Sequence, residues 1–209
     1  MAKEYYRGGC RFKIAKGVFY CMDAVFLDIE TSNNHAEKPE ELRTWITSIQ
    51  VLFKDKYYLF RYPEEFIDFL KSLNKRLCLK PGKFKKKLII FVHNLSYDLS
   101  YLYGYLQALP DYGETYQGII EDKNKFLTYV RGPFEFRCSY RLSGMSLEKW
   151  SKEMNIEHKK KIGLYDYNKI IYPDDKLTEA EQTYDKHDVL AMKECLEKQM
   201  AYYGDDLTT

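Results

Sequence analysis

The 209-residue chain lacks several features that mark common classes of protein. Its five cysteines are odd in number and include no Cys-x-x-Cys pair, which argues against a disulfide scaffold and against a zinc site. No apolar run approaches the roughly 18 residues that a membrane span needs, and the charged N-terminus has no apolar core of the kind found in signal peptides. We therefore expect a cytoplasmic protein in a reducing compartment, with no membrane partner.

A strong charge bias is also absent. The chain holds 33 basic and 31 acidic side chains, so any nucleic-acid site has to be a local patch. Residues 75–87 contain seven basic side chains and no acid. A solvated loop accounts for this run, and a loop that faces phosphates is the functional alternative. Aromatic residues, in contrast, are plentiful, with 20 tyrosines that suit either a core or stacking on bases.

Two carboxylates stand at the end of an apolar strand predicted over residues 23–29. Side chains alternate across a strand, so Asp28 and Glu30 share one face. A strand this apolar is typical of the centre of a sheet, covered on both faces. Two carboxylates that are removed from water repel each other and need a compensating cation. The alternative is a strand end at which both acids simply emerge into solvent.

A second apolar strand, predicted over residues 88–92, leads into a helix that has Asp98 at its start. Two strand ends with acids predict one shared site at one edge of a sheet. The last helix begins at a capping box at 178–181, and on it Tyr184 and Asp188 stand four residues apart on one face. Carboxylate oxygens suit Mg²⁺ or Mn²⁺, and two such ions about 4 Å apart can promote cleavage of a phosphodiester.

The remaining pattern predicts an alternation of strands and helices. Hairpins are expected over residues 45–60 and 126–140, and helices are expected to begin near residues 63 and 146. Residues 1–22 form an N-terminal extension with a possible short strand over residues 17–20, and the sequence assigns this extension no role. No internal repeat or low-complexity linker is present.

Three segments carry the acids and resemble the three exonuclease motifs of DnaQ-like proofreading nucleases. The segments are Asp28-Ile29-Glu30-Thr31, His93-Asn94-Leu95-Ser96-Tyr97-Asp98 and Tyr184-Asp185-Lys186-His187-Asp188. They are most similar to those of the protein-primed family B DNA polymerases of phages and linear plasmids. Ser146-Leu147-x-x-Trp150 is similar to a motif that contacts single-stranded DNA and the terminal protein in that family. Gly204-Asp205-Asp206-Leu207 resembles the run that leads into the polymerase palm.

The resemblance implies an α/β protein with an RNase H-like fold, in which helices flank a mixed five-stranded sheet. It implies an exonuclease domain over residues 23–204. Residues 205–209 are then the start of a truncated linker to a palm domain, and the rest of the polymerase chain is a partner. For a virus- or plasmid-encoded protein, the expected compartment is the cytoplasm of a bacterial host.

The resemblance also implies roles for the site residues. Asp28, Glu30 and Asp188 surround one metal ion, Asp28 reaches a second ion, and Asp98 supports that ion directly or through water. Tyr184 orients the attacking water. The family has a lysine before the last helix that assists catalysis; Lys159, Lys160 and Lys161 compete for this place, and Lys161 is the residue chosen here.

The substrate implied by the resemblance is the 3′ end of a DNA single strand, with a terminal protein as a further partner. The residues that match the family's single-strand contacts are Thr31, Asn94, Tyr97, Ser146 and Leu147. Two alternatives remain beside a proofreading exonuclease. One is a stand-alone DnaQ-like nuclease that acts on RNA or short oligonucleotides, and the other is a non-catalytic module that grips single-stranded DNA or a terminal protein. The joint presence of four acids and Tyr184 weighs against the second.

Overall fold

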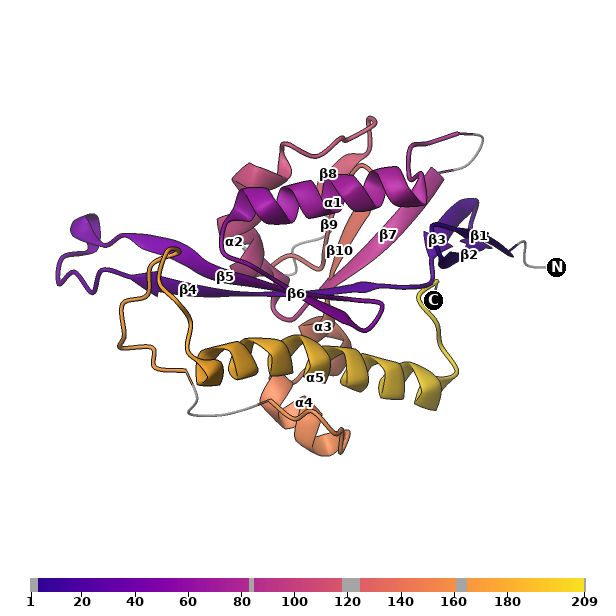
Figure 1. Cartoon of the computed structure of the whole chain (residues 1–209). Helices are drawn as coiled ribbons and strands as arrows, with labels where there is room; N and C mark the ends of the chain where they lie inside the picture. Colours follow the sequence, from indigo (N-terminus) through magenta and orange to yellow (C-terminus); the bar gives the residue numbers. More distant parts are fainter. Residues whose placement is uncertain (1–3, 83–84, 118–124, 161–164, 209) are drawn as a thin grey trace.

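The computed structural model describes residues 4–82, 85–117, 125–160 and 165–208, which form an α/β structure around one mixed sheet (Figure 1). In chain order the elements are β1 (Glu4–Arg7), β2 (Cys10–Ala15), β3 (Val18–Cys21), β4 (Val25–Asn33), the 3₁₀ helix η1 (Pro39–Glu41), β5 (Thr44–Phe53), β6 (Lys56–Phe60), α1 (Pro63–Leu77), β7 (Lys85–Val92), α2 (Leu95–Leu106), β8 (Thr115–Gln117), β9 (Thr128–Arg131), β10 (Phe134–Cys138), α3 (Ser139–Ser143), α4 (Leu147–Glu153) and α5 (Glu179–Tyr203).

The sheet is centred on β4 and β7, which run parallel with Leu27 opposite Val92. On one side β4 pairs antiparallel with β5, which continues antiparallel to β6. On the other side β7 pairs parallel with β10, and β9 and β8 follow as antiparallel neighbours. Because β4 and β7 run in the same direction, their carboxyl ends lie at one edge of the sheet, as the sequence predicted.

The described part of the sheet has ten strands, whereas the resemblance led us to expect five. The additional strands are β8 and β9 at one side and the antiparallel meander β1–β2–β3 at the other. The sequence indicated only β3 of this meander, as a possible strand over residues 17–20. β3 joins the sheet by pairing parallel with the beginning of β7, with Val18 opposite Lys85.

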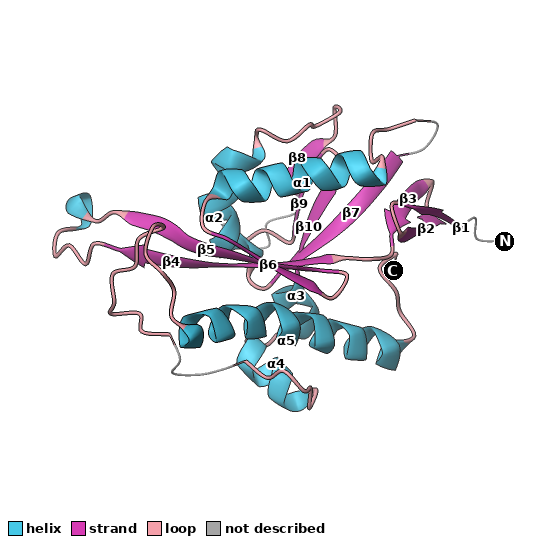
Figure 2. Cartoon of the chain, viewed as in Figure 1, coloured by secondary structure: helices cyan, strands magenta, loops and turns pink. Residues whose placement is uncertain are grey.

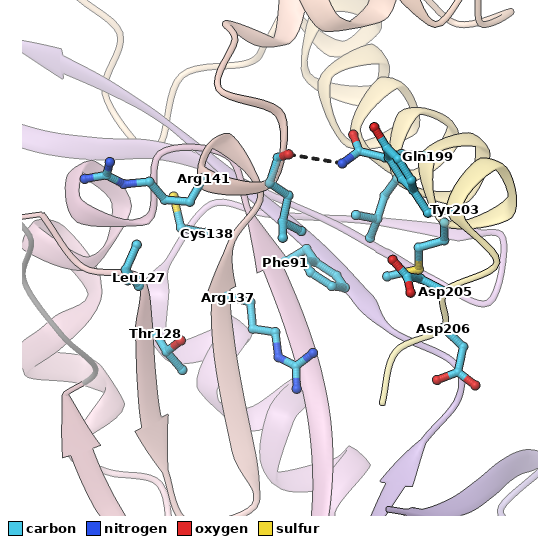
Figure 3. A pocket seen from close by; sticks show the side chains of 13 residues that line it. Phe91, Leu127, Thr128, Arg137, Cys138, Arg141, Gln199, Tyr203, Asp205 and Asp206 are labelled. Atoms are coloured by element: carbon cyan, nitrogen blue, oxygen red, sulfur yellow. Dashed lines mark hydrogen bonds between the residues drawn. The ribbon is translucent and has the colours of Figure 1, made fainter. Parts of the chain in front are cut away.

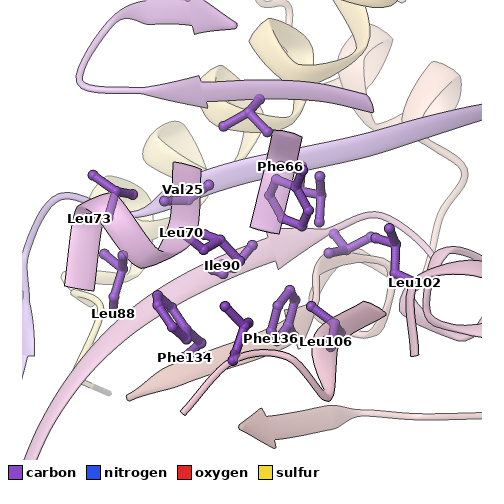
Figure 4. Packing of buried hydrophobic residues seen from close by; sticks show 14 of the residues in the cluster. Val25, Phe66, Leu70, Leu73, Leu88, Ile90, Leu102, Leu106, Phe134 and Phe136 are labelled. Carbon is purple, nitrogen blue, oxygen red and sulfur yellow. The ribbon is translucent and has the colours of Figure 1, made fainter. Parts of the chain in front are cut away.

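Helices cover both faces of the sheet, as the apolar character of β4 predicted (Figure 2). Along β4, Val25 and Leu27 belong to a core that α1 and α2 complete, and this packing is shown in Figure 4. Phe26 points to the opposite face, where it joins a second core with Trp150 of α4 and Met192 of α5. Alternation along one strand therefore separates two cores.

The helix boundaries follow from local chemistry. Pro63 begins α1, and Glu65 accepts backbone hydrogen bonds from Arg61 and Tyr62 at its start. At the start of α5, Thr178 and Glu181 form the predicted reciprocal capping box, and Gly204 ends the helix with a left-handed conformation. None of the helices in the described segments is both long enough and apolar enough to cross a lipid bilayer.

Candidate active site

Three of the predicted metal ligands converge where β4 ends against α5. Asp28 and Glu30 lie on the β4 face that α5 covers, and α5 contributes Asp188. One carboxylate oxygen from each of the three lies within 4.8 Å of the others. Alternation along a strand and packing of one helix thus bring together acids that are 160 residues apart in the sequence.

The fourth predicted acid, Asp98, approaches the same edge from the first turn of α2. Asn94 precedes this helix in the left-handed conformation, with φ of 69°, and so turns the chain sharply after β7. Asp98 is 2% exposed, and its Oδ1 atom has no hydrogen-bond partner in the described structure. Burial raises the pKa of Asp98, and the negative charge of Asp28 raises it further.

The acids lack sufficient countercharge among the described residues. Burial raises the pKa of both Asp28 and Glu30, and neighbouring carboxylates raise the pKa of each further. Asp188 is fully buried, and its Oδ1 atom has no hydrogen-bond partner in the segments described. An all-carboxylate donor set with unpartnered buried oxygens fits a hard divalent cation, because such a cation satisfies both charge and coordination.

A lysine does reach the cluster, but it is Lys160. Its Nζ lies 2.7 Å from Asp188 Oδ2 and 5.2 Å from the centre of the Tyr184 ring. Burial lowers the pKa of Lys160, but the carboxylates of Asp188, Asp28 and Glu30 outweigh this effect and raise the pKa. Lys161, the residue chosen from the sequence, lies outside the described residues. Of the three competing lysines, Lys160 is thus the one whose contact with the acids can be described.

Tyr184 lies one helical turn before Asp188, as predicted, and is 3% exposed. Its hydroxyl is 2.9 Å from the hydroxyl of Tyr167, a residue that the sequence gave no reason to select. Burial raises the pKa of Tyr184, and the charges of Asp188 and Glu30 raise it further. The phenol therefore stays neutral at physiological pH and can donate a hydrogen bond.

A further acid, Asp185, was not selected from the sequence. It is fully buried on α5, and its Oδ2 accepts a hydrogen bond of 3.0 Å from Ser48 on β5. Burial raises the pKa of Asp185 to about 6, although hydrogen bonds from Gln50 and Ser48 oppose the shift. The spacing of three residues between Asp185 and Asp188 was a helical signal that could have identified it.

The residues predicted to contact single-stranded DNA fall into two groups. The first group consists of Thr31, which follows Glu30 on β4, and Tyr97, at the start of α2. Thr31 Oγ1 and Tyr97 OH lie 2.5 Å apart. The Tyr97 side chain is 45% exposed, so its ring is accessible for stacking. The ring of Tyr101 packs against it with centroids 5.3 Å apart.

The second group lines a cavity of about 530 Å³ beside the acids. Asn94, Ser146 and Leu147 all contribute to its wall, and so does Lys160, which links the cavity to Asp188. Ser146 is also the N-cap of α4, because its hydroxyl accepts a hydrogen bond from the backbone of Lys149. Leu147 is 5% exposed and forms part of the wall rather than a protruding contact.

Other features of the described structure lie apart from these residues. A cavity of about 310 Å³ lies between β10, α3 and the end of α5, and none of the predicted site residues that the structure describes lines it (Figure 3). Cys10, Cys21 and Asp23 lie close together, as do Glu157, His158 and Glu194. The sequence contains no Cys-x-x-Cys pair, so it did not predict that Cys10 and Cys21 lie close together.

Comparison with known proteins gives a fold for the chain. No protein-family model and no curated protein matches the sequence. Among solved structures, Phi29 DNA polymerase in complex with primer-template DNA and incoming nucleotides is similar, with a TM-score of 0.66 and 17% identity over 90% of this chain and 32% of that chain. The binary complex of Phi29 DNA polymerase with primer-template DNA has a TM-score of 0.67 and 16% sequence identity. The complex with single-stranded DNA has a TM-score of 0.65 and 17% sequence identity.

The chain thus has the fold of the matching part of these polymerase structures and spans about a third of their length. The resemblance to protein-primed polymerases that the motifs predicted is confirmed at the level of the fold.

Proposed function

We propose that this protein is the 3′→5′ exonuclease domain of a protein-primed family B DNA polymerase. The observation that carries the proposal is the convergence of Asp28, Glu30 and Asp188 oxygens within 4.8 Å, beside a lysine and a buried tyrosine. The similarity to Phi29 DNA polymerase supports the larger context, because that protein's structures hold primer-template or single-stranded DNA.

The fold supports an RNase H-like assignment. The strands β6, β5, β4, β7 and β10 form a mixed five-stranded middle, flanked by α1 and α2 on one face and by α4 and α5 on the other. In this proposal residues 23–204 are the exonuclease domain and residues 1–22 extend its sheet. Residues 205–209 begin the linker to the rest of the polymerase.

In the proposed reaction, Asp28, Glu30, Asp98 and Asp188 hold two Mg²⁺ or Mn²⁺ ions. Bound ions of this kind activate a water molecule and stabilise the leaving oxygen of a phosphodiester. Asp28 belongs to the oxygen cluster with Glu30 and Asp188, and its charge also raises the pKa of Asp98, so it suits a ligand shared by both ions. The neutral hydroxyl of Tyr184 orients the attacking water, since it can donate to or accept from that water without ionising.

Lys160 has a positioning role in this proposal. Its ammonium holds one oxygen of Asp188 and leaves the other, Oδ1, for the metal. The same ammonium lies over the ring of Tyr184 and so fixes two site residues relative to each other. Lys161 was the choice made from the sequence, and its part in the reaction stays a prediction.

The proposed substrate is the 3′ end of a DNA single strand. Tyr97 and Thr31 lie beside Glu30, where a stacked terminal base would contribute on the order of 1–3 kcal/mol without sequence preference. Asn94, Ser146 and Leu147 line the adjoining cavity, which offers space for a further nucleotide. A terminal protein is a further proposed partner, on the resemblance of the Ser146-Leu147 motif alone.

The activity can be tested with a single strand labelled at its 5′ end. With Mg²⁺ we expect a ladder of products that shorten one nucleotide at a time from the 3′ end, and no cleavage when EDTA is added. Random internal cuts would indicate a different nuclease. A strand left intact by folded protein in Mg²⁺ and Mn²⁺ would exclude the nuclease and leave a binding module.

A further inference from the structure

Two stretches of the chain contain basic residues and no acid. Residues 5–22 contain four basic side chains, and residues 75–87 contain seven. Removing these eleven from the chain's 33 basic residues leaves 22, against 31 acids. The nearly neutral total therefore conceals a concentration of positive charge in two segments.

The fold places these two segments side by side. The pairing of β3 with β7 sets Val18 opposite Lys85 and Tyr20 opposite Lys87. In Figure 1, β1, β2 and β3 lie beside the C-terminal end of α1 and the beginning of β7. The acids lie at the other end of β7. Seven residue steps of strand separate Lys85 from Val92, a distance of about 23 Å.

Close contacts anchor the N-terminal meander on α1. A Cβ atom on Gly8, whose φ is +58°, would lie 2.8 Å from the carbonyl oxygen of Arg76, so the β1–β2 turn packs directly on the helix end. Arg7 Nη2 lies 2.8 Å from Cys78 Sγ, and Lys86 donates a hydrogen bond of 2.7 Å to Cys78 O. Two cations from different strands thus meet at the residue that ends α1.

Four of the ten cations that the structure describes in these segments pair with an acid. Arg11 and Lys13 pair with Glu4 and Asp206, and Lys85 and Lys87 share Glu114. Within the described segments, the others have no carboxylate within ion-pair distance; they are Arg7, Lys16, Lys75, Arg76, Lys80 and Lys86. The C-terminal dipole of α1 supplies only about half a negative charge. A net positive surface therefore remains.

We propose that this surface, defined by Arg7, Lys16, Lys75, Arg76, Lys80 and Lys86, binds the phosphate backbone of a nucleic acid. The cations come from the end of β1, the β2–β3 turn, the end of α1 and the beginning of β7, so they are spread over a surface and do not gather at one point. A nucleic-acid strand suits this arrangement because it presents a phosphate about every 3.4 Å. The site is separate from the acids, and the proposal does not rest on nuclease activity.

The test compares two triple variants with equal charge. Lys16→Gln/Lys75→Gln/Lys80→Gln removes three exposed lysines of the surface, none of which has a side-chain hydrogen bond or ion pair in the described structure. Lys38→Gln/Lys152→Gln/Lys176→Gln removes three exposed lysines located elsewhere. Binding of a labelled 20-base-pair duplex and of a labelled 20-nucleotide single strand is measured by fluorescence anisotropy in EDTA over a series of NaCl concentrations.

We expect the first variant to bind at least one of the two nucleic acids about tenfold or more weakly at low salt. The slope of log affinity against log salt should fall by about 0.9 per lost phosphate contact on the duplex or about 0.7 on the single strand. The second variant should keep the wild-type slope. Whichever nucleic acid shows the change is the one that the surface binds.

Equal slopes for the wild type and the first variant on both nucleic acids would overturn the proposal, as would equal losses in both variants. Thermal unfolding of each variant verifies that it is folded. Mg²⁺-dependent hydrolysis of a thymidine monophosphate nitrophenyl ester is measured in parallel. A wild type that binds with the expected slope but does not cleave would count against the nuclease alone.

Discussion

The two ends of the central strands concentrate like charges in different ways. At the carboxyl ends of β4 and β7, buried acids converge with Lys160 as the cation that contacts them. Around the beginning of β7, cations gather in excess of the acids that pair with them. The acids are held by β4, α2 and α5. By contrast, Lys16, Lys75 and Lys80 are exposed, and within the described structure their side chains have no hydrogen bond or ion pair.

The difference shows how burial decides what ligand a charge cluster requires. Buried carboxylates interact strongly because water screens them poorly, so they need a discrete cation at a fixed position. Exposed charges are screened by salt over a Debye length of about 10 Å at 0.1 M, so exposed lysines favour an extended polyanion and bind it more weakly as salt rises. The predictions below test this contrast, beginning with the largest expected effect.

The largest effect should follow removal of two acids. Asp28→Ala with Glu30→Ala should reduce Mg²⁺-dependent cleavage of a 5′-labelled single strand by about 10³-fold or more, because the metal loses two carboxylates. Affinity for DNA in EDTA should survive. The matched control is Glu37→Ala with Glu40→Ala, two exposed acids. Equal cleavage by both double variants would contradict the role of the acids.

The next largest effect on the cleavage rate should follow removal of the lysine that contacts Asp188. Lys160→Met should lower the cleavage rate about 10²-fold, because Asp188 loses the ammonium that holds its Oδ2. Lys159→Met and Lys161→Met serve as controls that change the same charge one residue away. If Lys161→Met causes the large loss and Lys160→Met does not, the original choice from the sequence is right and the positioning role of Lys160 is wrong.

Asp185 should make stability depend on pH in the absence of metal. Its pKa is about 6 in the folded protein against 3.8 as an ordinary value. A raised carboxyl pKa means that the folded state binds the proton more tightly, so this group destabilises the fold as pH rises from about 4 to 6. The cost above pH 6 is about 2–3 kcal/mol. Asp185→Asn should flatten this part of the curve of unfolding free energy against pH in EDTA, and an unchanged curve would contradict the raised pKa.

The smallest effect should follow loss of one hydroxyl. Tyr184→Phe should cleave about tenfold more slowly, since the ring packing stays but the group that orients water is removed. Its Mn²⁺ affinity should equal that of the wild type, which separates orientation of water from metal binding. Tyr165→Phe, which also removes a buried hydroxyl near the site, is the control. A Tyr184→Phe rate equal to the wild-type rate would remove this role.

Much of the acid site followed from local periodicity. Alternation in β4 placed Asp28 and Glu30 on one face, and helical spacing in α5 placed Tyr184 beside Asp188. Lys160 could not be singled out, because three adjacent lysines in a loop have no period that selects one. Tyr167 also lies outside the helices and strands, so no periodic pattern in the sequence could identify it.

Two of the three strands of the N-terminal meander, β1 and β2, were missed, and the pairing of β3 was not predicted. β1 and β2 are short, and β3 is fixed by its pairing with β7, which follows more than sixty residues later. Non-local pairing of this kind leaves no trace in a short window of sequence. The basic run at 75–87 was visible in the sequence, but only the fold brought residues 5–22 beside it.

The most direct test of the central claim is to locate bound metal. Crystals soaked in Mn²⁺ should show anomalous scattering between Asp28, Glu30 and Asp188, with a second peak on the side of Asp28 that faces Asp98. The basic surface should show none. Crystals that diffract well after soaking but show no Mn²⁺ at these acids would contradict the account of the active site.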